Sequence, residues 1–175
     1  IRQWQDDNMP QITFAINLSA TKFVKKQLLG DLISVLQTYS IEPECIELEL
    51  TETIAIGNPQ FALSTITKLR EAGFKMSIDD FGTGYSALGY LHQLPIHIMK
   101  IDKSFIDHLN KAHNPLVDAI LSLAQSLKLD VVAEGIETEK QLAILKQTQC
   151  KFGQGFLKAK PMPASEAEKV ITHGL

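Results

Sequence analysis

The feature that most constrains the fold is a regular alternation of two kinds of segment along the chain. Short runs rich in β-branched and aromatic residues are followed by longer runs with the apolar spacing of a helix. The alternation repeats at intervals of roughly 20 to 35 residues, as expected of strand–helix–strand units with parallel strands. The predicted strands are residues 12–19, 45–52, 74–80, 96–102 and 130–137, with a sixth inside 150–163. The sequence therefore predicts an α/β fold with about six strand–helix units.

Helices are predicted between these strands, and two of them carry residues that start or stop a helix. Gly73 closes the helical run 61–73 as a C-terminal cap, and Pro115 lies in the first turn of 114–129. The other predicted helices are residues 28–40, 85–94, 138–149 and 164–173. Because neither a linker nor a break in composition interrupts the pattern, residues 1–175 are predicted to form a single domain.

Two architectures fit this pattern, a doubly wound open sheet and a (β/α)₈ barrel. A complete barrel takes about 250 residues, whereas this chain has 175. Six units would therefore form a barrel without its first part. The opening sequence IRQWQDDNMP reads as the tail of a helix and lacks an initiator methionine, so we expect the chain to be a piece of a longer protein.

Charge and cysteine content limit the possible partners and the compartment. The formal net charge of −3 gives no basic field that would attract a nucleic-acid polymer. The two cysteines, Cys45 and Cys150, lie far apart, which argues against a disulfide framework or a zinc site and fits a reducing compartment. No apolar run reaches the length of a membrane span. We therefore expect a cytoplasmic domain, either free or as the cytoplasmic part of a membrane-anchored sensor.

Polar side chains gather where the predicted strands end. The residues are Asn17, Glu49, Glu52, Asp79, Asp80, Lys100, Asp102, Glu134, Glu137 and Gln154. Parallel α/β proteins bind ligands outside the carboxyl ends of their strands. The sequence therefore predicts that one rim of the sheet carries the functional site.

The second strand indicates which way its acidic side chains point. Because side chains alternate along a strand, the apolar residues of CIELELTE share one face and Glu47, Glu49 and Thr51 share the other. In a barrel the apolar face meets the helices, so the acidic face points into the barrel. Carboxylates buried there need an ion-pair partner or a bound cation. Lys100 can pair with one of them, and the others favour a metal.

The adjacent pair Asp79 and Asp80 extends this interpretation. Together with Asn17, Glu49 and Glu134 these residues form an all-oxygen set, which selects Mg²⁺ or Mn²⁺ rather than zinc. Two such ions would suit the hydrolysis of a phosphodiester. Gly82 and Gly84 would allow a mobile loop over the site. Two alternatives remain open: the aspartate pair could cap a helix, and Lys100 could be a structural ion-pair partner only.

Several motifs resemble those of the EAL-domain cyclic-di-GMP phosphodiesterases of bacteria, in order along nearly the whole chain. They are NLS (17–19), ELTE (49–52), DDFGTGYSAL (79–88), KIDKSFI (100–106), AEGIE (133–137) and GQGFLKAKPMP (153–163). The resemblance implies a TIM-barrel-like fold of the EAL type, of which this chain would be the C-terminal two-thirds or so. It also implies hydrolysis of cyclic di-GMP to pGpG with two Mg²⁺ or Mn²⁺ ions.

The resemblance implies roles for individual residues. It makes Asn17, Glu49, Asp79 and Glu134 metal ligands, with Asp80 serving the second ion. Lys100 would touch the water or the substrate, Glu52 would anchor the loop at 82–90, and Glu137 and Gln154 would line the substrate site. Domains of this family often form homodimers and follow GGDEF, PAS or receiver domains, so we expect such partners here.

One departure from the family pattern affects the expected function. The chain contains no Glu-Ala-Leu tripeptide, although this motif supplies a metal ligand in the family. We therefore carry two hypotheses, a metal-dependent cyclic-di-GMP phosphodiesterase and a catalytically inactive EAL domain that senses cyclic di-GMP or binds proteins.

Overall fold

The computed structural model describes residues 1–7, 9–83, 88–109 and 114–173. At its centre lies a parallel sheet of six strands, which follow one another in the sheet in the order of the sequence. The strands are β1 (Phe14–Asn17), β2 (Ile46–Thr51), β3 (Lys75–Phe81), β4 (Ile98–Ile101), β5 (Asp130–Ala133) and β6 (Phe152–Gly153). The predicted α/β class and its six repeating units are confirmed.

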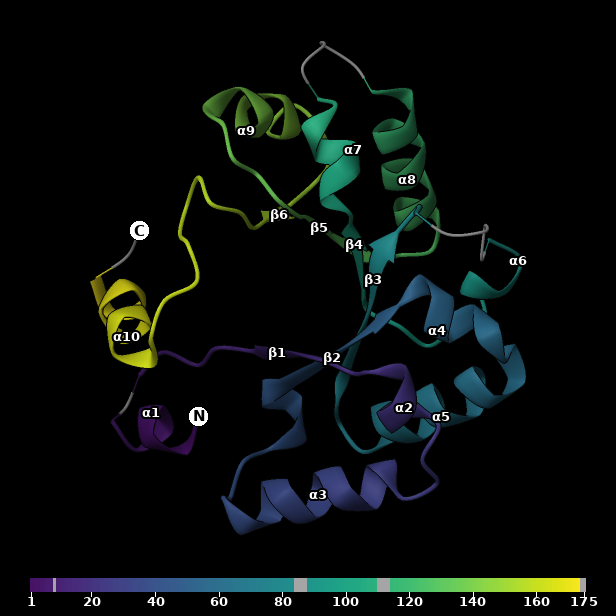
Figure 1. Ribbon diagram of the computed structural model, residues 1–175, viewed down its shortest axis with the longest axis vertical. Helices are drawn as coiled ribbons and strands as arrows, with labels where there is room; N and C mark the ends of the chain where they lie inside the picture. Colours follow the sequence, from purple (N-terminus) through teal and green to yellow (C-terminus); the bar gives the residue numbers. More distant parts are fainter. Residues whose placement is uncertain (8, 84–87, 110–113, 174–175) are drawn as a thin grey trace.

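Helices surround the outer side of this sheet (Figure 1). The longer ones are α3 (Leu28–Thr38), α5 (Pro59–Glu71), α8 (Pro115–Ser126), α9 (Glu139–Leu145) and α10 (Ala164–His173). The shorter ones are α1 (Arg2–Asp6), α2 (Ala20–Phe23), η1 (Pro43–Cys45), α4 (Glu52–Gly57), α6 (Leu88–Leu91) and α7 (Lys103–Asp107). Among the helices of the described ranges, none has the length and apolar character that crossing a membrane requires.

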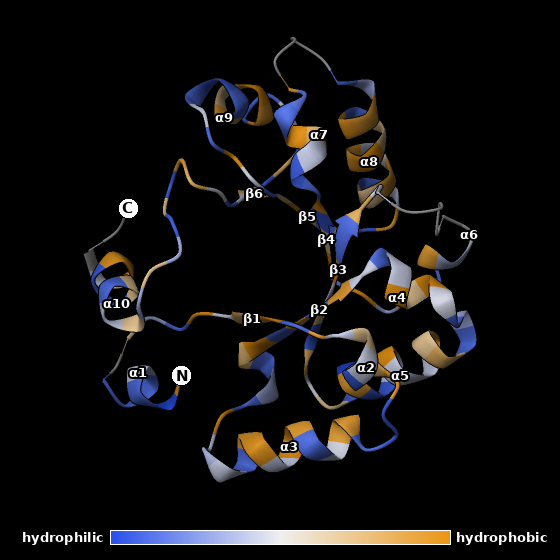
Figure 2. Cartoon of the chain, in the orientation of Figure 1, coloured by the Kyte–Doolittle hydropathy of each residue, from blue (hydrophilic) through white to orange (hydrophobic). Residues whose placement is uncertain are grey.

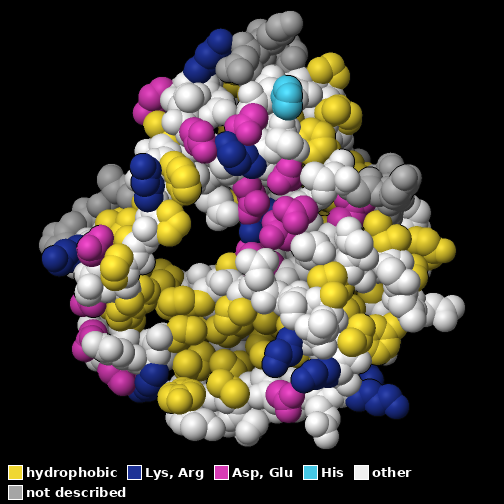
Figure 3. Space-filling model, viewed as in Figure 1, with side chains coloured by type: hydrophobic (Ala, Val, Ile, Leu, Met, Phe, Trp, Pro, Cys, Tyr) yellow, Lys and Arg dark blue, Asp and Glu magenta, His cyan; other side chains and the backbone are white. Residues whose placement is uncertain are grey.

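The sheet curls like part of a barrel but does not close. Within the described residues, β1 pairs with β2 alone and β6 pairs with β5 alone, so both edges remain open. Figure 3 shows the resulting hollow at the centre of the molecule. The sequential strand order lacks the reversal that defines a doubly wound sheet. The structure therefore confirms the incomplete TIM-barrel-like fold and excludes the doubly wound alternative.

The main core lies between the outward face of the sheet and the helices. Leu48, Leu50, Met76 and Met99 are almost completely buried there, as is Ile66 of α5. Burying one such side chain stabilises the fold by about 1.5–3 kcal/mol. Apolar residues line the inner sides of α5 and α8 in Figure 2. The predicted assignment of faces on β2 is correct, because its apolar residues face the helices and its acids face the hollow.

Several strands end earlier than the sequence predicts, and the chain turns at these points. β5 stops at Ala133 within the predicted strand and exit 130–137, and Gly135 in the exit adopts a φ of 71° and redirects the backbone. Asp102 leaves β4 to cap α7, where its carboxylate accepts a hydrogen bond from the backbone N–H of Ser104 at 3.0 Å. Because β4 and β5 end early, polar residues lie on short turns at the carboxyl ends of these strands.

The predicted helices are present: α10 has the predicted bounds, α5 is shifted by two residues, and α3, α6, α8 and α9 are shorter than predicted. Asn58 caps α5 by accepting a hydrogen bond from the backbone N–H of Phe61, and Gly73 follows the helix with a φ of 101°. α6 covers only four residues of the predicted 85–94 helix. Residues 85–87 of that helix, and Gly84 of the predicted loop, lie outside the described residues.

Candidate active site

Strand register brings the predicted site residues to one end of the sheet. Asn17 of β1 lies opposite Glu49 of β2, and Thr51 of β2 lies opposite Asp79 of β3. Glu134 follows β5, whose Ala133 lies opposite Ile101 of β4. Figure 3 shows the result as a group of acidic side chains around a basic one, at the edge of the central hollow. The rim predicted from the sequence is therefore formed.

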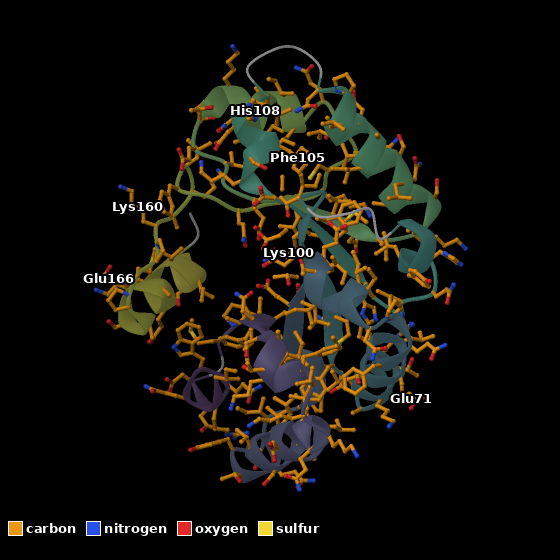
Figure 4. All side chains as sticks on the ribbon, turned by 45° about the vertical axis from the view of Figure 1, so that its right-hand side comes forward. Glu71, Lys100, Phe105, His108, Lys160 and Glu166 are labelled. Atoms are coloured by element: carbon orange, nitrogen blue, oxygen red, sulfur yellow. The ribbon has the colours of Figure 1, made fainter. Side chains whose placement is uncertain are left out.

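Lys100 is the centre of this group. Its Nζ lies 2.6 Å from Oε1 of Glu49, 2.6 Å from Oε1 of Glu134 and 3.5 Å from Oδ1 of Asp79. The lysine side chain is only 6% exposed, and Figure 4 shows it inside the curve of the sheet. Burial alone would lower the pKa of Lys100, but its hydrogen bonds to Glu134 and Glu49 raise that pKa above the ordinary value. Lys100 therefore stays charged and holds together carboxylates from β2, from β3 and from the turn after β5.

Asp79 and Asp80 both reach the site because β3 is irregular at its end. Regular alternation would send these adjacent side chains to opposite faces of the sheet. The register with β4 shifts between Ile78 and Phe81, and Asp80 adopts a φ of 54°. The backbone N–H of Asp80 donates to Oδ1 of Asp79 at 3.0 Å. The bulge thus turns both carboxylates towards the same end of the sheet.

Three carboxylates come close enough to share a metal ion. One oxygen atom each of Asp79, Asp80 and Glu134 lies within 4.8 Å of the other two. Burial raises the pKa of Asp80, and the charge of Asp79 raises it further. Burial also raises the pKa of Glu134, although its contact with Lys100 acts in the opposite direction. Crowded carboxylates that resist ionisation are stabilised by a divalent cation, so this oxygen donor set fits Mg²⁺ or Mn²⁺.

Glu52 ties the start of the loop after β3 to the site. It is the first residue of α4 and is 2% exposed. Its Oε2 accepts a hydrogen bond from the backbone N–H of Gly82 at 2.9 Å. Gly82 has a φ of 96°, and a Cβ atom there would lie 2.9 Å from the ring of Phe105. Glu52 thus holds the start of the predicted 82–90 loop at Gly82, a position whose backbone conformation and close contact with Phe105 require glycine.

The two predicted substrate-binding residues lie in different surroundings. Gln154, just after β6, donates from Nε2 to Oε1 of Glu134 at 2.6 Å and so joins the carboxylate group. Glu137 instead pairs with Nζ of Lys103 at 2.9 Å, and its side chain is 45% exposed. Asn17 is exposed on the edge strand β1 beside Glu49. Glu137 and Asn17 therefore lie at the margin of the site.

Sequence reasoning missed two residues that support this region. Gln141 is 5% exposed, and its Oε1 accepts hydrogen bonds from the backbone N–H groups of Glu137 and Thr138. Its Nε2 donates to the carbonyl of Ile106, which ties the turn after β5 to α7. Ser77, level with Glu49 in the register, is fully buried, and its hydroxyl has no partner among the described residues. The contact between Gln141 and Thr138 does have a local signal, the capping-box spacing Thr-x-x-Gln at 138–141. The bond from Gln141 to Ile106 and the burial of the Ser77 hydroxyl have none.

Comparison with known proteins gives consistent matches. A family model described as "EAL domain" matches residues 1–161. The bifunctional diguanylate cyclase/cyclic di-GMP phosphodiesterase MucR of Pseudomonas aeruginosa is 41% identical over 170 residues, covering 95% of this chain and 24% of that protein. The chain spans about a fifth to a quarter of the length of the first curated relatives it matches.

Solved structures show the same likeness. The complex of the PaMucR phosphodiesterase with c-di-GMP is 40% identical with a TM-score of 0.89, over 95% of this chain and 68% of that chain. A manganese/cyclic-di-GMP complex of BlrP1 from Klebsiella pneumoniae is 28% identical with a TM-score of 0.80, over 91% of this chain and 42% of that chain.

Proposed function

The chain belongs to the EAL domain family, and we propose that it carries the metal-binding carboxylates of a cyclic-di-GMP phosphodiesterase that produces pGpG. The observation that supports this proposal most strongly is the convergence of Glu49, Asp79, Asp80 and Glu134 around Lys100. These side chains come from β2, from the end of β3 and from the turn after β5, and they meet where parallel α/β proteins bind their ligands.

The proposed roles follow from position and chemistry. Asp79, Asp80 and Glu134 would hold divalent cations, with Glu49 beside them and Asn17 on the neighbouring edge strand. Two such ions, Mg²⁺ or Mn²⁺, supply the positive charge that binds phosphate oxygens and lowers the pKa of a bound water. The manganese in the complex of the Klebsiella relative supports this choice of metal.

Lys100 adds a fixed positive charge within reach of the same carboxylates. It would orient Glu49 and Glu134 and offer a hydrogen bond to a phosphate oxygen or to the attacking water. Glu52 would position the loop after β3 through the N–H of Gly82. Gln154, already bonded to Glu134, would contact the substrate, and Glu137 would line the outer margin of the site.

A catalytically inactive module that binds cyclic di-GMP is the second candidate. Lys100 already neutralises part of the carboxylate group through two contacts of 2.6 Å, and the 175 residues contain no Glu-Ala-Leu tripeptide. Both features would suit a site that keeps its shape without turnover. Contact with a partner protein would be a further use of such a module.

The rest of the protein would control this domain. MucR, of which the chain covers 24%, is named a bifunctional diguanylate cyclase/phosphodiesterase. We accordingly propose that the whole protein carries a GGDEF, PAS or receiver domain, acts as a homodimer and works in the cytoplasm.

Incubation with cyclic di-GMP separates the two candidates. The chain, and the longest version of its parent protein, are mixed with cyclic di-GMP and Mn²⁺, and pGpG is followed by chromatography. Formation of pGpG supports the enzyme. Saturable binding of cyclic di-GMP in Ca²⁺ without pGpG in Mn²⁺ supports the binding module. Absence of both binding and turnover in the parent protein contradicts both candidates.

A further inference from the structure

A second polar pocket lies at the opposite end of the sheet from the carboxylates. Its volume is about 550 Å³, and it opens beside the amino ends of β4 and β5. Its walls come from the end of α5, the connection 91–97 that leads into β4, and the connection 127–130 that leads into β5. None of the site residues described above lines it.

Among the ionisable side chains that line this pocket, basic ones outnumber acidic ones. Arg70, His92, His97 and Lys128 line it, and Asp130 is its sole carboxylate. Asp130 already pairs with Nζ of Lys151 at 3.2 Å. In the part of the chain that the structure describes, Arg70 and Lys128 form no ion pair. The net charge of the chain is −3, yet this pocket holds two positive charges, those of Arg70 and Lys128, without an ion-pair partner within the described ranges.

The backbone fixes the position of His97. Its N–H donates to the carbonyl of Met76 at 2.9 Å, and its carbonyl accepts from the N–H of Asp130 at 3.0 Å. The N–H of Met76 also donates to Nδ1 of His97 at 3.3 Å. Because Nδ1 accepts, the neutral ring carries its proton on Nε2 and can donate from there. His97 is thus a rigid hydrogen-bond donor on the pocket wall.

Electrostatics agree with this geometry. Burial lowers the pKa of His97, and the charges of Arg70 and Lys75 lower it further. A hydrogen bond with the backbone of Met76 and the charge of Glu47 raise this pKa, with smaller effects. The lowered pKa favours the neutral ring, and the charges of Arg70 and Lys75 contribute to this after burial. An anion in the pocket would be attracted by the charges of Arg70 and Lys128 and could accept a hydrogen bond from His97.

We propose that this pocket binds a phosphate group. A guanidinium, an ammonium and imidazole donors provide several N–H groups, and a phosphate dianion has enough acceptor oxygens to use them at once. This site needs no metal, in contrast to the carboxylate end of the sheet. Phosphate binding at this pocket is a function separate from the proposed hydrolysis and does not depend on it.

Phosphate binding in the presence of EDTA tests the proposal apart from any metal-dependent activity. Isothermal titration calorimetry of the chain with inorganic phosphate should give one saturable site with a Kd below about 1 mM. The imidazole C–H resonances of His97 should shift during the titration. Ribose 5-phosphate, titrated in parallel, separates the two sources of the group: tighter binding indicates an organic phosphate, and equal binding indicates the free ion.

Charge-removing variants locate the site. Arg70→Gln and Lys128→Asn should each weaken phosphate binding at least about tenfold, which corresponds to about 1.4 kcal/mol. Asparagine is chosen at position 128 because the backbone there has a φ of 58°, which asparagine tolerates. Lys68→Gln is the matched control, since Lys68 is exposed on the same helix as Arg70 and does not line the pocket. Absence of saturation up to 10 mM phosphate, or an equal loss in the Lys68 variant, would overturn the proposal.

Discussion

Asp80 donates its backbone N–H to the carboxylate of Asp79 at 3.0 Å, at the bulge that ends β3. This local bond accompanies a left-handed backbone at Asp80 and brings two adjacent carboxylates to one end of the sheet. A regular strand would have placed them on opposite faces. The proposed two-metal site depends on this irregularity together with the central position of Lys100.

Removing a carboxylate from the group should abolish hydrolysis. We expect Glu49→Ala and Asp79→Ala, made in the longest active version of the protein, to lower kcat by at least about 100-fold. Asp79→Ala removes a proposed metal ligand, and Glu49→Ala removes a carboxylate beside the proposed ligands. The rate of pGpG formation at saturating Mn²⁺ measures this effect. Glu71→Ala, an exposed acid on α5, is the control and should keep the parent rate. Normal turnover in either site variant would refute the assigned roles.

Lys100→Met should destabilise the metal-free protein. The variant leaves Glu49, Asp79 and Glu134 without their buried counter-charge, and loss of one partner of a buried ion pair costs about 3–5 kcal/mol. Urea unfolding in EDTA measures the change, and added Mn²⁺ should restore part of it. The control is Lys103→Met, whose contacts with Asp107 and Glu137 are exposed, so its loss of stability should be much smaller than that of Lys100→Met. Equal losses in the two variants would contradict a central role for Lys100.

The stability of the metal-free protein should fall as carboxylates in the site ionise. The pKa values of Asp80 and Glu134 are raised in the fold from the ordinary 3.8 and 4.5. The folded state therefore holds these protons more tightly than the unfolded state does. Their stabilising contribution is complete below the ordinary pKa values and is lost as the pH rises through the raised ones.

Thermal unfolding across this pH range tests that prediction. The melting temperature of the unmutated chain in EDTA should fall, relative to that of the Asp80→Asn variant, as the pH rises above about 4. Mn²⁺ should remove most of this relative fall, since the cation stabilises the ionised carboxylates. Parallel pH profiles of the two proteins in EDTA would show that Asp80 does not ionise in the way described.

Ser77→Ala should stabilise the metal-free protein. The hydroxyl of Ser77 is fully buried and lacks a partner among the described residues, and a buried unsatisfied group costs about 1–3 kcal/mol. Urea unfolding should show a gain on that scale. Ser126→Ala is the control, because its hydroxyl already donates to the carbonyl of Ser122 at 2.9 Å. A loss of stability in the Ser77 variant would mean that its hydroxyl has a partner in solution.

Glu52→Ala should slow turnover without weakening the binding of Mn²⁺. The variant frees the N–H of Gly82, so the loop after β3 loses an anchor while Asp79, Asp80 and Glu134 remain. Glu52→Gln keeps an acceptor oxygen and should retain more activity than Glu52→Ala. Kinetics and calorimetry on both variants separate the two effects. An equal loss of Mn²⁺ affinity in Glu52→Ala would instead make Glu52 part of the metal site.

The periodic parts of the fold could be predicted from the sequence, because they depend on local patterns. Alternation in β2 correctly placed Leu48 and Leu50 towards the helices and Glu49 towards the hollow. The strand–helix repeat also implied that Asp79 and Glu134 would share one rim. Each of these inferences needs only the period of a strand and the parallel order of the sheet.

The contacts that shape the site could not be predicted in this way. Simple alternation gives no reason for Asp80 to turn beside Asp79, since the bulge depends on the pairing of β3 with β4. The bond from Nε2 of Gln141 to the carbonyl of Ile106 joins segments that only the folded chain brings together. Pairing between Lys103 and Glu137 likewise joins residues 34 positions apart across two connections.

The measurement that tests the central claim most directly is anomalous diffraction from crystals grown with Mn²⁺. The account predicts strong anomalous peaks between the carboxylates of Asp79, Asp80 and Glu134, with Glu49 beside them. Peaks located elsewhere, or these carboxylates bound only to Lys100 at saturating Mn²⁺, would contradict it.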